Sequence, residues 1–160
     1  MEHSTNYQNM SLEDAVHYAR ENVNNRPQTT GRLAGKIAIV TGGAQGFGLG
    51  IAKEMVREGA TVVLADLNEE LAKTAAAEFG DRAIGIKVDV SNTQSVERMV
   101  IETVVRFGGL DIMVSNAGVL KAGSLAEMTQ ESFEFVTKVN YTGFFLCAKY
   151  ASEIMKAQYE

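Results

Sequence analysis

The chain has 160 residues, of which 46% are hydrophobic and 22% charged, and its formal net charge is −5 at pH 7. These values are typical of one globular domain, and the negative charge gives no electrostatic reason to expect nucleic-acid binding. No apolar run approaches the length of a membrane span, and the first residues lack the features of a signal peptide. A single cysteine, Cys147, permits no internal disulfide, and no His/Cys cluster suggests a metal site. We therefore expect a cytoplasmic protein that binds neither a membrane nor a metal ion.

Residues 1–32 are predicted to form an N-terminal extension. Ser11-Leu-Glu-Asp14 is typical of a capping box at a helix start, with Asp14 in place of the usual Glu. Apolar residues then recur at helical spacing: Leu12, Ala15, Val16, Ala19 and Val23. Residues 24–31, which contain the only proline of the chain, are typical of a linker. We expect a short helix that packs on the main domain or on a partner and carries no chemistry.

From Leu33 onward, short apolar segments alternate with amphipathic ones. We expect strands at 36–41, 61–65, 83–88 and 110–115. Helices are expected at 46–58, after Asn68, from a capping box at Ser91–Gln94, and from Thr129 towards the C-terminus. This alternation predicts an α/β fold with a parallel sheet and right-handed crossovers. In a Rossmann-type doubly wound sheet the strand order is 3-2-1-4, and a ligand lies at the carboxyl ends of strands one and four.

A glycine-rich turn, TGGAQGFGLG at residues 41–50, joins the first predicted strand to the first following helix. Glycine lets the backbone turn sharply and lets a phosphate approach without a Cβ in the way. The first N–H groups of the helix have no intrahelical partner and lie at the positive end of its dipole. The turn is therefore a candidate pyrophosphate site, or alternatively a turn that only brings helix and strand close together. Its candidate cofactor-binding residues are Gly42, Gln45, Gly46, Phe47 and Gly48.

Asp66 ends the second predicted strand, where a carboxylate can accept both hydroxyls of an adenosine ribose. It would repel the 2′-phosphate of NADP, and its expected neighbours Gln45 and Leu67 offer no cation to offset that repulsion. The sequence therefore favours NAD over NADP. The alternative is an Asp that only forms the turn before Asn68.

Two further groups of candidate residues follow the third and fourth strands. Asp89 can accept from an adenine amino group while Val90 offers its backbone N–H, although Asp89 can equally bond the turn ahead of Ser91. At Asn116-Ala117-Gly118, small residues would let the backbone lie against the adenosine, and Asn116 can tie neighbouring strand ends together.

These motifs, in this order, resemble the N-terminal part of the short-chain dehydrogenase/reductase family. The resemblance is carried by TGGAQGFG (family pattern TGxxxGxG), Asp66, Asp89-Val90, Asn116-Ala-Gly118 and Asn140-Tyr-Thr-Gly143. It implies hydride transfer between NAD(H) and a small-molecule secondary alcohol or ketone, in a homodimer or homotetramer formed through the last helix. The extension and the run at 45–50 are most similar to members that act on sugars and polyols, such as sorbitol-6-phosphate dehydrogenases. Phe47 stands where the family most often has Ile, with little expected effect because only its backbone N–H would meet the pyrophosphate.

The family's catalytic set is only partly present. A Ser and a Tyr-x-x-x-Lys motif normally follow the position of Asn140, which would itself hold a water linking that Lys to solvent. None of the five tyrosines here has Lys four residues later, so only Asn140 of this set is present. The family also has further strands after the fourth, so we expect a Rossmann domain at 33–160 that is incomplete after strand four and its following helix. We therefore expect this chain to carry the cofactor half only and to have no activity alone, which measurable alcohol turnover would contradict.

Two alternatives to an enzyme are a non-catalytic dinucleotide-binding module and an assembly domain that binds no nucleotide. For the last helix we expect an apolar stripe with Gly143 inside it, packed on a neighbouring helix. The stripe consists of Phe133, Val136, Val139, Phe144, Cys147, Ala148 and Ala151. Nothing near Cys147 in the sequence marks it as a nucleophile.

Overall fold

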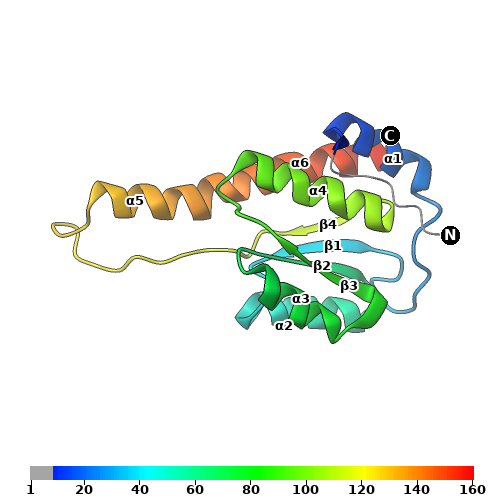
Figure 1. Cartoon of the computed structure of the whole chain (residues 1–160), viewed down its shortest axis with the longest axis horizontal. Helices are drawn as coiled ribbons and strands as arrows, with labels where there is room; N and C mark the ends of the chain where they lie inside the picture. The colour runs from blue at the N-terminus through cyan, green and yellow to red at the C-terminus, as the bar shows by residue number, and fades with distance from the viewer. Residues whose placement is uncertain (1–8) are drawn as a thin grey trace.

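The computed structural model describes residues 9–160 and shows a four-stranded parallel sheet with helices on both faces (Figure 1). The strands are β1 (Ile37–Thr41), β2 (Thr61–Asp66), β3 (Ala83–Lys87) and β4 (Ile112–Val114). Their order is β3-β2-β1-β4, which confirms the predicted doubly wound arrangement. β1 pairs with β2 from Ile37↔Thr61 and with β4 from Ala38↔Ile112, so the carboxyl ends of all four strands lie along one edge.

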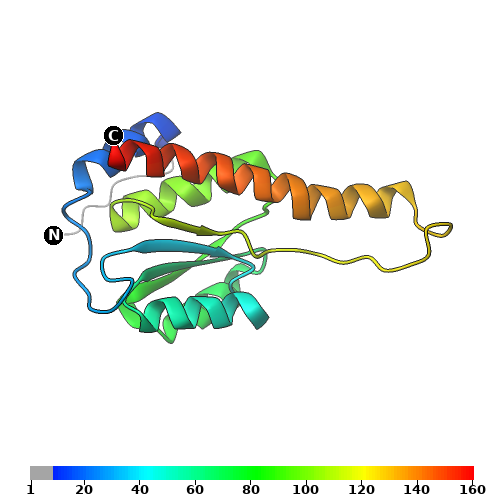
Figure 2. The same ribbon diagram turned by 180° about the vertical axis from the view of Figure 1, so that it is seen from behind.

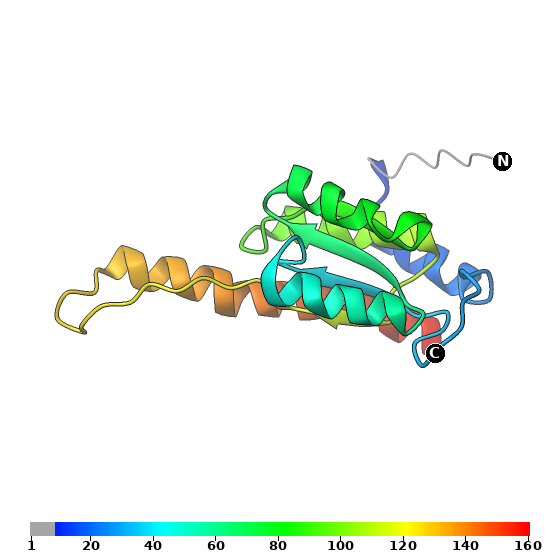
Figure 3. The ribbon, with the colours of Figure 1, turned by 90° about the horizontal axis from the view of Figure 1, so that it is seen from below.

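The helices form one layer on each face of the sheet. α2 (Gly46–Arg57) and α3 (Glu69–Ala77) cover one face, and α4 (Thr93–Phe107) and α6 (Gly143–Tyr159) cover the other (Figure 3). A short 3₁₀ turn, Gly80–Arg82, precedes β3. Alternate residues of β1 point to opposite faces, so that Val40 packs in the core under α2 and α3 while Ile39 packs with α4 and α6. Both faces of the sheet are therefore covered by helices, as a parallel sheet requires, although β4 at its edge is only half-buried.

α5 (Gln130–Thr137), a π-helical turn (Lys138–Thr142) and α6 follow one another as a single long run (Figure 2). α5 projects past the sheet, at the end of the molecule opposite α1 (Leu12–Asn22) (Figure 1). We call residues 119–137, the loop after β4 together with α5, the arm. No residue of α5 or of the π turn is buried.

The apolar stripe predicted for the last helix is wrong in part. Cys147 and Ala151 are buried as expected, but Phe133, Phe144 and Ala148 are exposed. Leu146, Tyr150 and Ile154 complete the buried face instead. The reason is that α5 extends beyond the sheet and that the π turn interrupts the 3.6-residue period on which the prediction depended.

The predicted capping box at Ser91–Gln94 is also wrong. Asn92 is the N-cap of α4, and its side chain accepts a hydrogen bond from the backbone N–H of Ser95. The hydroxyl of Ser91 instead donates to Asp89, 2.7 Å away. Ser91 therefore belongs to the turn before α4 rather than to its cap.

The N-terminal extension docks on the main domain. The capping box of Ser11 and Asp14 is present at the start of α1. Ala15 and Ala19 are buried in the same core as α4 and α6. The segment after α1 is also bonded to the domain, because Arg26 pairs with Asp111 immediately before β4. The extension thus closes the end of the sheet opposite the carboxyl ends of the strands.

Candidate functional site

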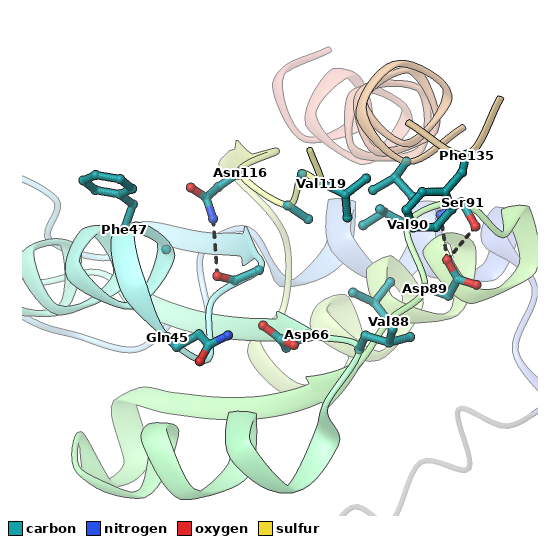
Figure 4. Close-up of a pocket in the computed structure, with 16 residues that line it drawn as sticks. Gln45, Phe47, Asp66, Val88, Asp89, Val90, Ser91, Asn116, Val119 and Phe135 are labelled. Atoms are coloured by element: carbon teal, nitrogen blue, oxygen red, sulfur yellow. Dashed lines mark hydrogen bonds between the residues drawn. The ribbon is translucent and has the colours of Figure 1, made fainter. Parts of the chain in front are cut away.

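A cavity of about 520 Å³ lies along the carboxyl ends of the strands (Figure 4). Its volume is within the range of small-molecule and cofactor sites. Eleven of the twelve predicted cofactor-binding residues line it, together with five residues that were not predicted. Its lining residues are Gly42, Gln45, Phe47, Gly48, Asp66, Leu67, Val88, Asp89, Val90, Ser91, Asn116, Ala117, Gly118, Val119, Phe135 and Val139. Of the predicted site residues, only Gly46 and Asn140 are not part of this lining.

The glycine turn leaves the start of α2 open to a ligand. Gln45 is the N-cap of α2 but makes no side-chain capping bond, whereas α1, α3, α4 and α5 are each capped by a Ser, Asn or Thr side chain. A Cβ on Gly48 would overlap the carbonyl oxygen of Gly42, so the turn can close this tightly only with glycine. Open space lies beside Gly46, whose φ is +56°. The free N–H groups and positive dipole end of α2 thus suit an anionic group.

Asp66 both shapes its turn and lines the cavity. Its Oδ2 accepts from the backbone N–H of Ala44 at 3.2 Å, and its Oδ1 accepts from that of Asn68 at 3.1 Å. A carboxylate has about four acceptor positions, so two remain for ligand hydroxyls. Among the described residues that line the cavity there is no Lys or Arg. The site therefore offers an acceptor for a ribose and no cation for a phosphate on it.

Asp89 is likewise used in a turn. Its Oδ1 accepts from the backbone N–H and the hydroxyl of Ser91, at 2.9 and 2.7 Å. Since these bonds involve one carboxylate oxygen, Oδ2 is left as an acceptor beside the cavity. Val90 next to it is buried and lines the same end of the cavity.

Asn116 ties the ends of β1 and β4 together, as predicted. Its Nδ2 donates to the carbonyl oxygens of Thr41 and Gly42, at 2.9 and 3.3 Å. The hydroxyl oxygen of Thr41, a buried residue, accepts in turn from the backbone N–H groups of Asn116 and Ala117, at 3.0 and 3.1 Å. These bonds hold the glycine turn against the backbone at 116–118. Thr41 was not among the predicted site residues, although it opens the glycine motif in the sequence.

Asn140 lies in the π turn, outside the cavity lining. Its side-chain amide pairs with the backbone of Val119, accepting at 2.8 Å and donating at 2.9 Å. The pair fixes the start of the arm to the helical run that follows it. Val119, Phe135 and Val139, which also line the cavity, were missed by the sequence analysis because no local pattern relates the arm to the strand ends.

Cys147 is buried, and this burial raises the pKa of its thiol to about 11, against the smaller lowering effect of a hydrogen bond with Ser115. A thiol with so high a pKa is a poor nucleophile. Over residues 9–160, no group of three or more His, Cys, Asp or Glu side chains is placed to hold a metal ion. Nor does any helix in that range have the length and apolar character needed to cross a bilayer.

Comparison with known proteins identifies the family. The sequence model of short chain dehydrogenases matches residues 36–160. The chain belongs to this family. The members of this family are oxidoreductases, and the chain has the Rossmann-like fold of the family's solved structures that it matches.

Among its relatives, sorbitol dehydrogenase of Cereibacter sphaeroides is 42% identical over 70% of this chain and 44% of its own length. Galactitol 2-dehydrogenase of Agrobacterium fabrum is 37% identical over 79% of this chain and 50% of its own. The structure is similar to that of a 3-ketoacyl-(acyl-carrier-protein) reductase from Brucella melitensis complexed with NADH, with a TM-score of 0.71 and 36% identity. That match covers 73% of this chain and 49% of the reductase. The chain thus spans about half the length of the relatives it matches.

Proposed function

We propose that this protein is an NAD(H)-dependent oxidoreductase that transfers a hydride between the nicotinamide cofactor and a secondary alcohol or ketone. The observation that carries the proposal is one cavity in which the uncapped start of α2, Asp66, Asp89 and Asn116 converge. The NADH bound to the similar Brucella reductase supports the choice of cofactor.

Each part of the cavity has a proposed role in holding NAD. The backbone N–H groups at 46–48 bind the pyrophosphate, and Asp66 accepts from the adenosine ribose. Asp89 and Val90 meet the edge of the adenine, and the backbone at Asn116–Gly118, held by Thr41, lies against the adenosine. When bound, the nicotinamide ring supplies or accepts the hydride.

We propose a sugar or polyol as the substrate. The names of two relatives, sorbitol dehydrogenase and galactitol 2-dehydrogenase, support this class. In this proposal the described chain provides the cofactor half of the site and Asn140. The Ser and Tyr-x-x-x-Lys of the family belong to the part of its relatives that this chain does not span.

The cofactor proposal is tested by titrating the purified protein with NADH and with NADPH, following the fluorescence of the reduced nicotinamide. Asp66 is expected to favour NADH, because a hydrogen bond to a charged group contributes about 1.5–3 kcal/mol, or roughly 10- to 100-fold in affinity. Asp66→Asn keeps the shape of the side chain but removes its charge, so the ratio of the two affinities should narrow. Asp81→Asn, the same change at an exposed residue outside the cavity, should leave the ratio unchanged. Equal affinities in the unmutated protein would contradict the role given to Asp66.

A further inference from the structure

The far end of the cavity is bounded by a residue of the arm. Phe135, on α5, lines the cavity together with Val139 of the π turn. Figure 4 shows Phe135 beside Val90 and Ser91, on the side away from Gln45 and Phe47. The cavity therefore extends from the glycine turn to the arm.

The chemistry changes along this path. The end near α2 offers backbone N–H groups without a side-chain cap, and the middle offers the carboxylate of Asp66. At the far end the lining is mostly apolar, with Val88, Val90, Val139 and the ring of Phe135 around the carboxylate of Asp89. A flat apolar group with a polar edge, such as a purine, matches such a surface.

Phe135 is held in place although the arm has little cover. The residue is 46% exposed, and no residue of α5 is buried. Lys121, on the loop of the arm, places its ammonium 5.9 Å from the centre of the ring. The amide of Asn140 also bonds both backbone groups of Val119, which fixes the arm where it leaves the sheet. The exposed ring is thus positioned at the cavity before any ligand covers it.

We infer that Phe135 forms an aromatic wall of the adenine subsite, so that the arm contributes directly to the affinity for the adenosine half of the cofactor. This inference depends on the proposed function, because it assumes that the cavity binds a dinucleotide. Phe135 acts as a cofactor-contacting residue and takes no part in hydride transfer. Its contribution comes from stacking and from burial of a ring that is otherwise half exposed.

Phe135→Ala in the purified protein is expected to weaken NADH binding about five- to tenfold, near the low end of measured base–aromatic stacking effects. ADP-ribose, which contains the adenosine half but no nicotinamide, should lose affinity by the same factor, measured by calorimetry. Phe133→Ala is the matched control, since Phe133 lies on the same helix, is 63% exposed and does not line the cavity. It should leave both affinities unchanged, and Phe135→Tyr, which keeps an aromatic ring, should restore most of the binding.

The inference is overturned if Phe135→Ala binds NADH as tightly as the unmutated protein does, or if Phe133→Ala weakens binding equally. It is also overturned if Phe135→Ala weakens NADH binding while ADP-ribose binding is unchanged, because the effect would then lie outside the adenosine half. No NADH binding by the unmutated protein would instead refute the proposed function, and this inference with it. Circular dichroism of each variant shows whether the fold is kept.

Discussion

Replacing Arg26 by Met should destabilise the chain by about 3 kcal/mol at pH 7. Arg26 Nη1 lies 2.7 and 2.8 Å from the two carboxylate oxygens of Asp111, and the two side chains are only 8% and 3% exposed. Removing one partner of a buried ion pair leaves an uncompensated charge, which costs about 3–5 kcal/mol. We expect the lower end of this range. Asp111 keeps bonds from the backbone of Ile37 and the hydroxyl of Tyr159, so its charge is not left without partners. The bond from Arg26 Nη2 to Gln158 is lost as well, but Nε of Arg26 has no partner to lose.

The loss should be smaller in acid. Burial raises the pKa of Asp111, but hydrogen bonds from Ile37, Arg26 and Tyr159 together with the Arg26 charge outweigh it and hold the pKa below its usual value. A carboxylate with a lowered pKa in the folded state stabilises the fold above its ordinary pKa, near 3.9, and loses that contribution as the pH falls. In Arg26→Met the pKa of Asp111 should rise, so that protonation relieves the buried charge at a higher pH. The difference from the unmutated protein should therefore shrink between pH 7 and pH 4.5.

Urea unfolding followed by circular dichroism measures both effects. The control is Arg32→Met, which removes an exposed arginine, 82% accessible, from its pair with Glu58. Exposed ion pairs contribute little, so this variant should unfold close to the unmutated midpoint. If Arg26→Met and Arg32→Met lower the midpoint equally, or if the Arg26→Met loss is the same at both pH values, the reasoning about the buried pair is wrong.

Two further predictions concern the glycine turn and Cys147. Gly48→Ala should abolish NADH binding in a fluorescence titration, because the new Cβ overlaps the carbonyl of Gly42. Gly50→Ala, in the same helix but with open space beside it, should bind NADH normally. Retained NADH binding by Gly48→Ala would contradict the close packing of the turn. For Cys147, a pKa of about 11 in place of the ordinary 9.0 leaves roughly 100-fold less thiolate at pH 8. The folded protein should therefore react with a thiol-specific disulfide reagent far more slowly than the urea-unfolded protein does. Equal reaction rates would contradict the burial of Cys147.

Features that depend on local sequence were predictable. The alternation of apolar strands with amphipathic helices gave the strand order, because right-handed crossovers leave few other arrangements for parallel strands. The bonds from Asn116 to Thr41 and Gly42 follow from the same order, since β1 and β4 are neighbours and end at the same edge. The carboxylate of Asp66 bonds the turn to Asn68 and also lines the cavity, so the turn role does not exclude the ribose-binding role predicted for it.

Features that depend on tertiary contacts were not predictable. Ser91 and Asn92 are both good N-cap residues, and only the position of Asp89 decides that Ser91 bonds the turn while Asn92 caps α4. The π turn around Asn140 has no local signal in the chain, and it changes which residues of the last helix are buried. Phe135 meets the cavity only because the chain, after leaving β4 and running beyond the sheet, turns back as α5 towards the strand ends (Figure 1), which no spacing in the sequence indicates.

The measurement that tests the central claim most directly is a calorimetric titration of the purified, unmutated protein with NADH and, separately, with NADPH. We predict saturable binding of one NADH per chain, at the cavity where the strand ends of β1, β2, β3 and β4 converge, with weaker binding of NADPH. The absence of saturable NADH binding, or tighter binding of NADPH than of NADH, would contradict the proposal that this cavity is an NAD site.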